Sequence, residues 1–245
     1  AISSENGTTS ATSMPIDVSI AAVADTPSLS VSPASGDEDQ PIALAISASS
    51  LDINEAVSVT ISGIPAGAPL SAGHDNGDGS WTLTQEQLAN LTLTPPANYS
   101  GTLNLSVTAT SNDHGSTAST APISLPVTVA AVADTPSLSV SPASGDEDTI
   151  IPLNILASVT DSSEILSVTI SGIPAGAALS AGHDNGDGSW TLTQEQLANL
   201  TLTPPANYSG TLNLSITATS SDHGSTATTA PISLPVTVAA VADTP

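Results

Sequence analysis

Apolar and polar residues alternate along most of this chain, in short segments separated by turn-forming residues. Alternation with a period of two places successive side chains on opposite faces of a β-strand. Between these segments the chain is rich in Gly, Pro, Asn, Asp and Ser, which favour turns. The pattern predicts an all-β chain. Within residues 25–133 the expected strands are Ser28–Ser32, Pro41–Ala48, Val57–Ser62, Trp81–Thr84, Leu91–Thr94, Leu103–Ala109 and Ile123–Val129.

Two segments depart from the alternating pattern. Residues 84–91 are the only candidate helix, of one or two turns, with Thr84 as the N-cap and Gln87 three residues later. The segment His74-Asp75-Asn76-Gly77-Asp78-Gly79 looks a little like a calcium-binding EF-hand loop, but it begins with His and has Gln85 where the loop needs Glu. A tight turn before the strand at Trp81 explains Asn-Gly and Asp-Gly better.

The chain contains a long internal repeat. The string VADTP begins at Val23, Val132 and Val241, a spacing of 109 residues, and the two complete copies share 94 of 109 residues. Eleven of the fifteen differences lie within 40–57. A unit of this length with seven short strands suits an immunoglobulin-like β-sandwich, so we expect tandem sandwiches joined end to end by short linkers. The expected domains are 1–24, the closing segment of a preceding copy; 25–133 and 134–242, complete copies; and 243–245, the start of another.

The charge of the chain is extreme. It carries 23 acidic residues and neither Lys nor Arg, for a net charge of −23. Nucleic acids and anionic membrane surfaces both require basic side chains, so neither is an expected partner. Because no carboxylate can pair with Lys or Arg, a cation from solution is the remaining partner, and calcium is the expected one. The chain has no cysteine, which excludes disulfides and thiolate metal sites.

Five segments of the repeat carry specific motifs: GDED at 36–39, ISGIPAGA at 61–68, NGDGSWTLT at 76–84, LTLTPP at 91–96 and SGTLNLSVTA at 100–109. They resemble the extender repeats of giant RTX-type biofilm adhesins, and the similarity covers the whole repeat twice. The resemblance implies a secreted, cell-surface protein of a Gram-negative bacterium, exported by type I secretion. It also implies a monomeric spacer whose joints between neighbouring repeats are rigidified by calcium.

The acidic residues are expected to converge between the copies. The turn that carries Asp37, Glu38 and Asp39 should lie at the bottom of the first sandwich. The turn that carries Asp161 and Glu164 should lie at the top of the second sandwich, so the two turns face the same joint. Asp222 should lie near the latter turn, and Asp134 lies in the linker. The candidate metal ligands, with their equivalents in both copies, are Asp25, Asp37, Glu38, Asp39, Asp52, Glu55, Asp113, Asp134, Asp146, Glu147, Asp148, Asp161, Glu164, Asp222 and Asp243. The alternative is an acidic rim that is simply solvated.

Other functions find less support in the sequence. Asp52 and Glu55 are the only carboxylate pair worth considering for catalysis, and no enzyme is expected. The four His residues lie in turns and are expected to be exposed. Trp81 and Tyr99 are expected in the core and in a tyrosine corner. They could instead stack on a sugar, so a sugar- or cell-binding adhesive module remains the alternative function.

Overall fold

The computed structural model describes residues 1–11 and 13–242, and these form a nearly all-β chain. The helical content of the described residues is limited to two 3₁₀ turns, η1 (Glu86–Leu88) and η2 (Glu195–Leu197). No helix there is long and apolar enough to cross a bilayer. The tail 243–245, with Asp243 and the expected start of a further repeat, lies outside the described residues.

The chain divides into two compact units. The first comprises Ala1–Ala34, Ala43–Leu93 and Leu103–Val127, and the second comprises Ser35–Ile42, Thr94–Thr102 and Thr128–Pro245. The strands up to Ala130 are β1 (Ile2–Glu5), β2 (Thr8–Ala11), β3 (Ser28–Ser32), β4 (Ala34–Asp37), β5 (Ile42–Ala43), β6 (Ala45–Ser49), β7 (Ala56–Ser62), β8 (His74–Asp75), β9 (Ser80–Thr84), β10 (Thr92–Leu93), β11 (Gly101–Asp113), β12 (Ser116–Ser119) and β13 (Ile123–Ala130).

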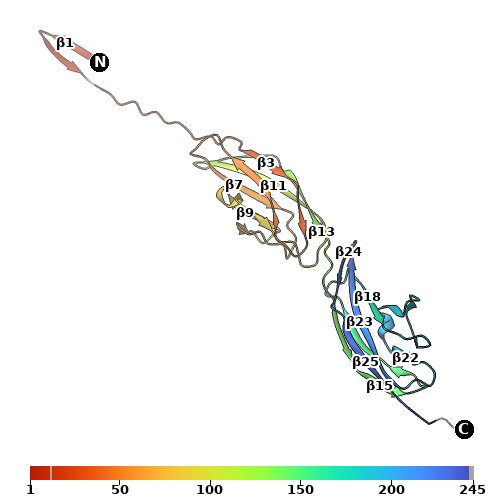
Figure 1. Cartoon of the computed structure of the whole chain (residues 1–245). Helices are drawn as coiled ribbons and strands as arrows, with labels where there is room; N and C mark the ends of the chain where they lie inside the picture. The colour runs from red at the N-terminus through yellow and green to blue at the C-terminus, as the bar shows by residue number, and fades with distance from the viewer. Residues whose placement is uncertain (12, 243–245) are drawn as a thin grey trace. The chain divides into compact units, whose positions relative to one another are not determined.

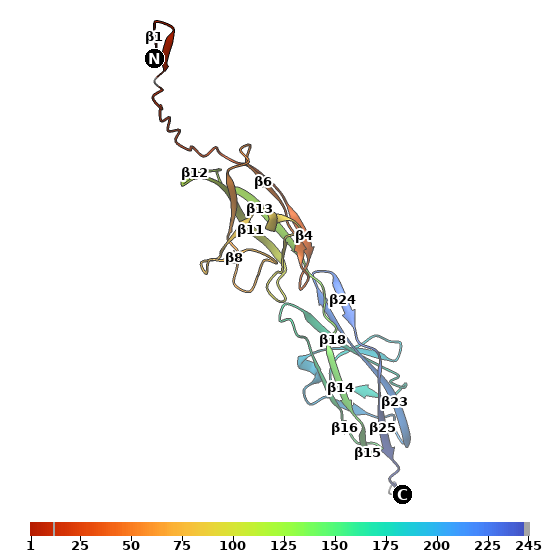
Figure 2. The same ribbon diagram turned by 90° about the vertical axis from the view of Figure 1, so that its left-hand side faces the viewer.

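The second copy of the repeat forms a β-sandwich. One layer has the strand order β15-β25-β23-β18-β21-β20, with β24 on β23, and the other is built from β14-β17 and β16-β22-β19 (Figures 1 and 2). The strands are β14 (Ser137–Ser141), β15 (Ala143–Asp146), β16 (Ile151–Pro152), β17 (Asn154–Ser158), β18 (Ile165–Ser171), β19 (Ala178–Leu179), β20 (His183–Asp184), β21 (Ser189–Thr193), β22 (Thr201–Thr203), β23 (Gly210–Asp222), β24 (Ser225–Thr228) and β25 (Ile232–Ala239).

Side-chain alternation builds the core of this sandwich. Along β23, Leu212, Leu214, Ile216 and Ala218 are buried, and the residues between them are exposed or half-buried. β23 pairs with β18 on one side and with β25 on the other, so it is a central strand of its layer. Its buried side chains belong to the core. The buried core of this sandwich consists of Ile, Leu, Val and Ala. The β-sandwich class is therefore confirmed.

The structure refines several sequence expectations. The strand expected at Pro41–Ala48 is interrupted at Leu44, whose N–H donates to the carbonyl of Leu91 at 2.9 Å instead of continuing the ladder. The expected helix is a single 3₁₀ turn that begins after Gln85, not Thr84. Gln87 Oε1 accepts the N–H of Thr84 at 2.9 Å, but the N-cap residue Gln85 makes no side-chain capping bond.

The two aromatic residues of the repeat lie at the edges of the core. Tyr99 is half-buried and its hydroxyl donates to the carbonyl of Thr102 at 3.3 Å, which is the kind of bond expected of a tyrosine corner. Trp81 was expected inside the core, but it is only half-buried. It pairs with Ile61 of β7 on one side and with Asp75 of the short strand β8 on the other, and it lines a hollow in the surface.

Candidate metal centre

Three carboxylates from distant parts of the sequence come together in the second compact unit. Oxygens of Glu38, Asp161 and Asp222 all lie within 4.8 Å of one another. The three residues are 4%, 6% and 2% exposed, respectively. A group of acidic side chains this close and this buried needs a compensating charge, and the chain has no Lys or Arg to supply it.

Glu38 is held by the tight turn that follows β4. Its N–H donates to the carbonyl of Ala130 at 3.0 Å, and its Oε1 accepts the N–H of Val132 at 2.7 Å. The next residue, Asp39, has a φ of 57°, and its Oδ1 accepts the N–H of Asn98 at 3.0 Å. The backbone around Glu38 is therefore fixed on both sides, and the side chain has a defined direction.

Asp161 lies in the loop between β17 and β18. Its two carboxylate oxygens accept the N–H and the hydroxyl of Ser163, at 2.8 and 2.6 Å. These bonds stabilise the charged form and lower the pKa of Asp161. Asp161 is thus an ionised carboxylate, oriented by its own loop before any cation arrives.

Asp222 is the last residue of β23, where the chain turns toward β24. Its Oδ1 lies 2.5 Å from Nδ1 of His223, an exposed ring that follows it in the turn. Its Oδ2 is buried and has no hydrogen-bond partner. The strand end aims this carboxylate into the group, and the adjacent histidine satisfies only one of its oxygens.

Unpartnered oxygens mark the same region. Among the described residues, the buried side-chain oxygens without a hydrogen-bond partner are Glu38 Oε2, Glu164 Oε2 and Asp222 Oδ2. An ionised carboxylate left buried in this way is strongly disfavoured unless it takes up a proton or a cation.

The pKa of Glu38 points the same way. Burial raises it above its ordinary value of 4.5, the hydrogen bond from Val132 lowers it by less, and the charges of Asp222 and Asp161 raise it further. The site therefore has a deficit of positive charge. All of its donors are oxygens, the ligands that calcium prefers.

Other candidate ligands of the second copy surround this group without belonging to it. Asp134 donates its N–H to Glu164 Oε1 at 2.5 Å, and its carbonyl accepts the hydroxyl of Ser220. Its carboxylate Oδ2 accepts a weak bond from Thr160 at 3.4 Å. Asp134 and Glu164 therefore contact each other beside the group of three. Asp37 and Asp39 are exposed.

The first copy repeats part of this arrangement. Asp25 donates its N–H to Glu55 Oε1 at 2.6 Å, and Ser50 donates its hydroxyl to Glu55 Oε2. Asp113 lies 2.6 Å from Nδ1 of His114. Asp52 is exposed and bonds Asn54 within its own loop. Among the described residues, these side chains do not form a group of three close carboxylates.

A third set of candidates lies after β15. Glu147 Oε1 accepts the N–H of Val241 at 2.7 Å, as Glu38 accepts that of Val132. Asp148 Oδ1 accepts the N–H of Asn207 at 3.0 Å. Asp146 and Asp148 are exposed. In this region the described residues form no group of three close carboxylates around Glu147.

Sequence reasoning missed the residues that orient the group. Ser163 fixes Asp161, and the backbone N–H of Val132 fixes Glu38. A Ser two residues after an Asp in a loop is a local signal that could have indicated the first contact. No sequence signal indicates the second, because a backbone N–H is present at every residue except Pro.

The segment at His74–Gly79 forms the expected tight turn. Asp75 Oδ1 accepts the N–H of Gly77 at 2.9 Å, and Asp78 Oδ1 accepts the N–H and the hydroxyl of Ser80. The bonds from Ser80 lower the pKa of Asp78. Gly77 has a φ of 81°, in the region that favours glycine. The carboxylates here are used to close the turn.

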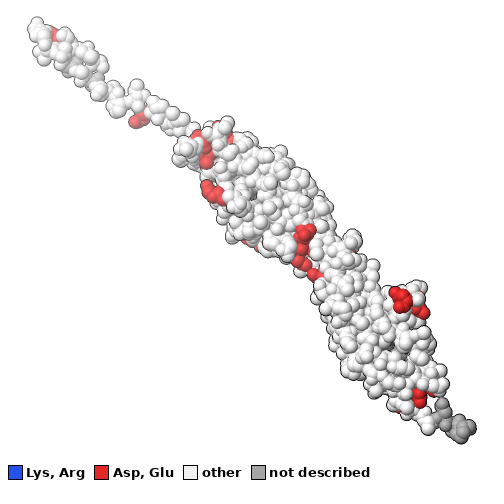
Figure 3. All heavy atoms as spheres, in the orientation of Figure 1, with Lys and Arg blue, Asp and Glu red and all other residues white. Residues whose placement is uncertain are grey.

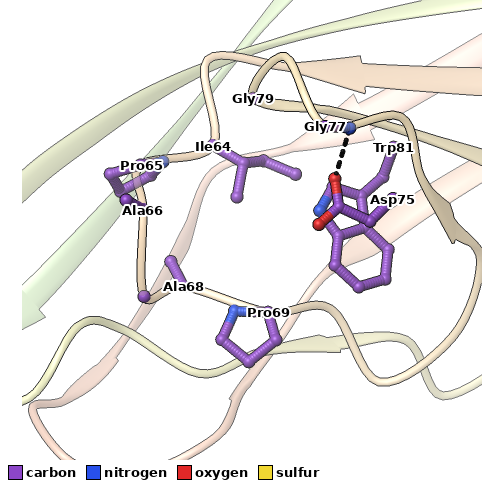
Figure 4. A pocket seen from close by; sticks show the side chains of 10 residues that line it. Ile64, Pro65, Ala66, Ala68, Pro69, Asp75, Gly77, Gly79 and Trp81 are labelled. Atoms are coloured by element: carbon purple, nitrogen blue, oxygen red, sulfur yellow. Dashed lines mark hydrogen bonds between the residues drawn. The ribbon is translucent and has the colours of Figure 1, made fainter.

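A hollow of about 390 Å³ lies between this turn and the loop after β7. Figure 4 shows the indole of Trp81 and the carboxylate of Asp75 on one side of it, and Pro65, Ala68 and Pro69 on the other. The lining is mostly apolar. In such a hollow the face of the Trp81 indole is available for stacking on a small ring.

Acidic residues are the only charged side chains on the surface apart from the histidines. Figure 3 shows them as separate groups on an otherwise uncharged face, with no basic side chain between them. The long-range repulsion of a net charge of −23 therefore acts on every part of the molecule, and bound cations would reduce it.

No protein-family model and no curated protein sequence matches the chain. Among solved structures it is similar to Sidekick-1 immunoglobulin domains 1–5, with 12% identity, a TM-score of 0.34, and 87% of this chain and 39% of that chain covered. It is also similar to the Yersinia pseudotuberculosis adhesin InvE, with 14% identity, a TM-score of 0.27, and 85% and 58% covered. Domains 4 and 5 of the S-layer protein SbsC share 16% identity, with a TM-score of 0.27 and 60% and 68% covered.

This chain thus spans less than two thirds of the Sidekick-1 and InvE structures. The similar proteins include a bacterial adhesin and an S-layer protein. At these identities and TM-scores, the similarity is too remote to transfer the function of any of them.

Proposed function

We propose that this chain is a spacer segment of a long bacterial surface adhesin, and that calcium rigidifies the joints between its repeats. The observation that supports the proposal most directly is the buried group of Glu38, Asp161 and Asp222, with two unpartnered oxygens and no basic residue in the chain. In the register of the repeat, Glu38 belongs to the first copy, and Asp161 and Asp222 belong to the second.

Calcium fits the chemistry of this group. It takes about six to eight oxygen ligands, from carboxylates, carbonyls and water, in a flexible geometry. Glu38, Asp161 and Asp222 would provide the carboxylates, and water would complete the shell. Magnesium suits the site less, because it demands near-ideal octahedral geometry and gives up its water reluctantly.

A cation at this position would act mechanically. It would tie the turn after β4 to two loops of the following copy, across a linker that consists of residues 131–136. Pro136 already restricts the backbone of this linker. The resemblance to RTX-type adhesins adds a location to the proposal: the outer surface of a Gram-negative bacterium, after type I secretion, where calcium is abundant.

Calcium titration of the whole chain tests the proposal. We expect a binding heat and a higher melting temperature in millimolar calcium than in chelator. A site at about a hundredfold excess over its dissociation constant contributes about 2.7 kcal/mol to the free energy of unfolding. The double variant Glu38→Gln with Asp222→Asn should lose most of both effects, and Asp75→Asn, in a turn that needs no cation, should keep them. Equal melting of the native chain with and without calcium would contradict the proposal.

The second candidate function is a sugar-binding module, and the observation that favours it is the open indole of Trp81. Trp81 and Asp75 line the 390 Å³ hollow together, and an aromatic face beside a carboxylate suits a neutral sugar ring. An anionic sugar is disfavoured by the net charge of −23. Binding of neutral oligosaccharides, abolished by Trp81→Ala and independent of Glu38→Gln, would favour this candidate over the spacer.

A further inference from the structure

The hollow of about 390 Å³ beside Trp81 lies between two walls that are fastened to each other. One wall is the turn at residues 75–80, and the other is the loop at residues 63–69 that follows β7. The N–H of Ile64 in the loop donates to the carbonyl of Gly79 in the turn at 3.0 Å. Gly79 has a φ of 80°, and an added Cβ there would lie 3.1 Å from the carbonyl oxygen of Ile64. The hollow is therefore preformed, so a ligand need not order its walls.

Asp75 and Trp81 lie together on one wall. They are cross-strand partners in β8 and β9, so their side chains project from the same face of the layer (Figure 4). Asp75 Oδ1 accepts the N–H of Gly77 at 2.9 Å, which leaves Oδ2 for a ligand. His74 precedes Asp75 in β8, so its side chain lies on the opposite face of the strand. Among the described residues, Asp75 therefore has no basic partner, and the chain has no Lys or Arg.

The lining suits a cation without hydrogen-bonding groups. Ile, Pro, Ala and Gly residues form it together with Asp75 and Trp81, so the indole N–H is the one side-chain donor. Sugar hydroxyls both donate and accept hydrogen bonds, and this lining offers them few donors. A quaternary ammonium ion needs no donor, and it is attracted both to the face of an indole and to a carboxylate. The net charge of −23 attracts cations and repels anions.

We propose that this hollow binds small quaternary ammonium ions of the choline type. The methylated ammonium group lies on the face of Trp81 beside the carboxylate of Asp75, and Pro65 and Pro69 across the hollow provide apolar contact. The proposal does not rest on calcium binding or on the spacer role. It also gives the hollow a different ligand from the neutral sugar considered above.

The same frame recurs in the second copy of the repeat. Asp184 is paired with Trp190, and the N–H of Gly186 donates to Asp184 Oδ1 at 2.9 Å. Of the residues that line the first hollow, only Pro69 differs between the copies, where the second copy has Ala178. Successive repeats therefore present the site once each. A single aromatic face binds such a cation weakly, and a surface that carries many of these cations is bound more tightly by avidity.

Nuclear magnetic resonance titration of the whole chain in chelator tests the proposal. The chain has two tryptophans, so the two indole N–H signals report the two copies separately, and Trp190→Phe identifies the signal of Trp81. The probes are choline and the neutral alcohol in which a tert-butyl group replaces the trimethylammonium group. The two probes have nearly the same shape and differ in charge. We expect choline to bind at Trp81 about tenfold more tightly than the alcohol.

Two variants locate the charge that attracts the cation. Asp75→Asn keeps an oxygen for the N–H of Gly77 and removes the carboxylate, so choline should bind about tenfold more weakly at Trp81 and unchanged at Trp190. Asp78→Asn is the matched control, because it removes one negative charge from the same turn outside the lining. It should have little effect. Equal binding of choline and the alcohol, or equal effects of the two variants, would overturn the proposal.

The remaining arms identify the source of the cation and separate the rival functions. Binding of choline together with phosphocholine would support the proposal with lipid headgroups as a source, and binding of choline alone would support it with the free cation as the source. A neutral oligosaccharide that shifts the Trp81 signal while choline does not would overturn it. A failure of the proposed spacer function looks different, because it is the absence of a calcium-dependent rise in melting temperature and leaves the titration in chelator unchanged.

Discussion

In the second copy Val159 occupies the position of Ser50, the residue whose hydroxyl contacts Glu55 in the first copy. In the first copy Ser50 donates its hydroxyl to Glu55 Oε2, whereas Glu164 Oε2 has no partner. The two glutamates are otherwise held alike, each by the N–H of an aspartate in the preceding linker. One substitution thus leaves a buried oxygen unsatisfied in the second copy and not in the first.

We expect Val159→Ser to stabilise the chain in chelator. The new hydroxyl should satisfy Glu164 Oε2, which is worth about 0.5–1.5 kcal/mol as an ordinary hydrogen bond and somewhat more to a charged group. Thermal unfolding in chelator measures the gain. The reciprocal variant, Ser50→Val, should destabilise the chain, because it removes the partner of Glu55. Opposite signs for the two variants are required, and the same sign for both would contradict this explanation.

The free energy of unfolding should depend on pH through the titration of Glu38. Burial raises the folded-state pKa of Glu38 above 4.5, so above that pH the folded chain binds its proton more tightly than the unfolded chain does. In chelator the contribution of Glu38 is therefore complete below about pH 4.5 and is lost as the pH rises through the folded-state pKa. Carboxylates with lowered pKa, such as Asp161 and Asp78, change stability only at lower pH.

Glu38→Gln isolates this effect. In chelator, the difference in free energy of unfolding between the variant and the native chain should change in favour of the variant as the pH rises from 4.5 toward neutral. Denaturant unfolding at a series of pH values measures it. Millimolar calcium should abolish the trend in the native chain, since the cation replaces the proton. A difference that is constant with pH would show that Glu38 binds its proton equally well in the folded and unfolded chains.

The linker aspartate should matter less for calcium than the strand-end aspartate. The carboxylate of Asp134 lies outside the group of three, whereas that of Asp222 lies within it with a free oxygen. We therefore expect Asp134→Ala to keep most of the calcium-dependent rise in melting temperature and Asp222→Ala to lose most of it. Asp75→Ala is the control for a plain turn. Loss of the calcium effect in Asp134→Ala alone would move the centre of the site into the linker.

Gly36→Ala should disturb the carboxylate group by shifting the backbone that leads to Glu38. An added Cβ at Gly36 would lie 2.7 Å from Cγ1 of Ile42, a side chain that is 2% exposed. Overpacking of this kind costs about 1–3 kcal/mol and shifts the local backbone. We expect a lower melting temperature and weaker calcium binding, because the turn that aims Glu38 begins two residues later. Gly77→Ala meets no neighbour within 4 Å and should leave calcium binding unchanged.

The sequence by itself determined the local structure and the kind of ligand. Alternation along segments such as Leu212–Ala218 is a property of neighbouring residues, so it identified the strands and the inward-facing side chains without any knowledge of the fold. The absence of Lys and Arg likewise showed, from composition alone, that the carboxylates lack basic partners. The 109-residue period located matching acidic residues in both copies.

Only the tertiary structure decided which acidic residues meet. Glu38, Asp161 and Asp222 are far apart in the chain, and their proximity depends on the turn after β4, the loop after β17 and the end of β23. The sequence treated Asp134 and Asp222 as equal candidates, because it cannot show that one carboxylate bonds Thr160 outside the group and the other is buried within it. It also placed Trp81 in the core, since nothing local indicates that the strand paired beside it, β8, is only two residues long. Burial and direction arise from the packing of distant segments, and these are the quantities that set a carboxylate's need for a cation.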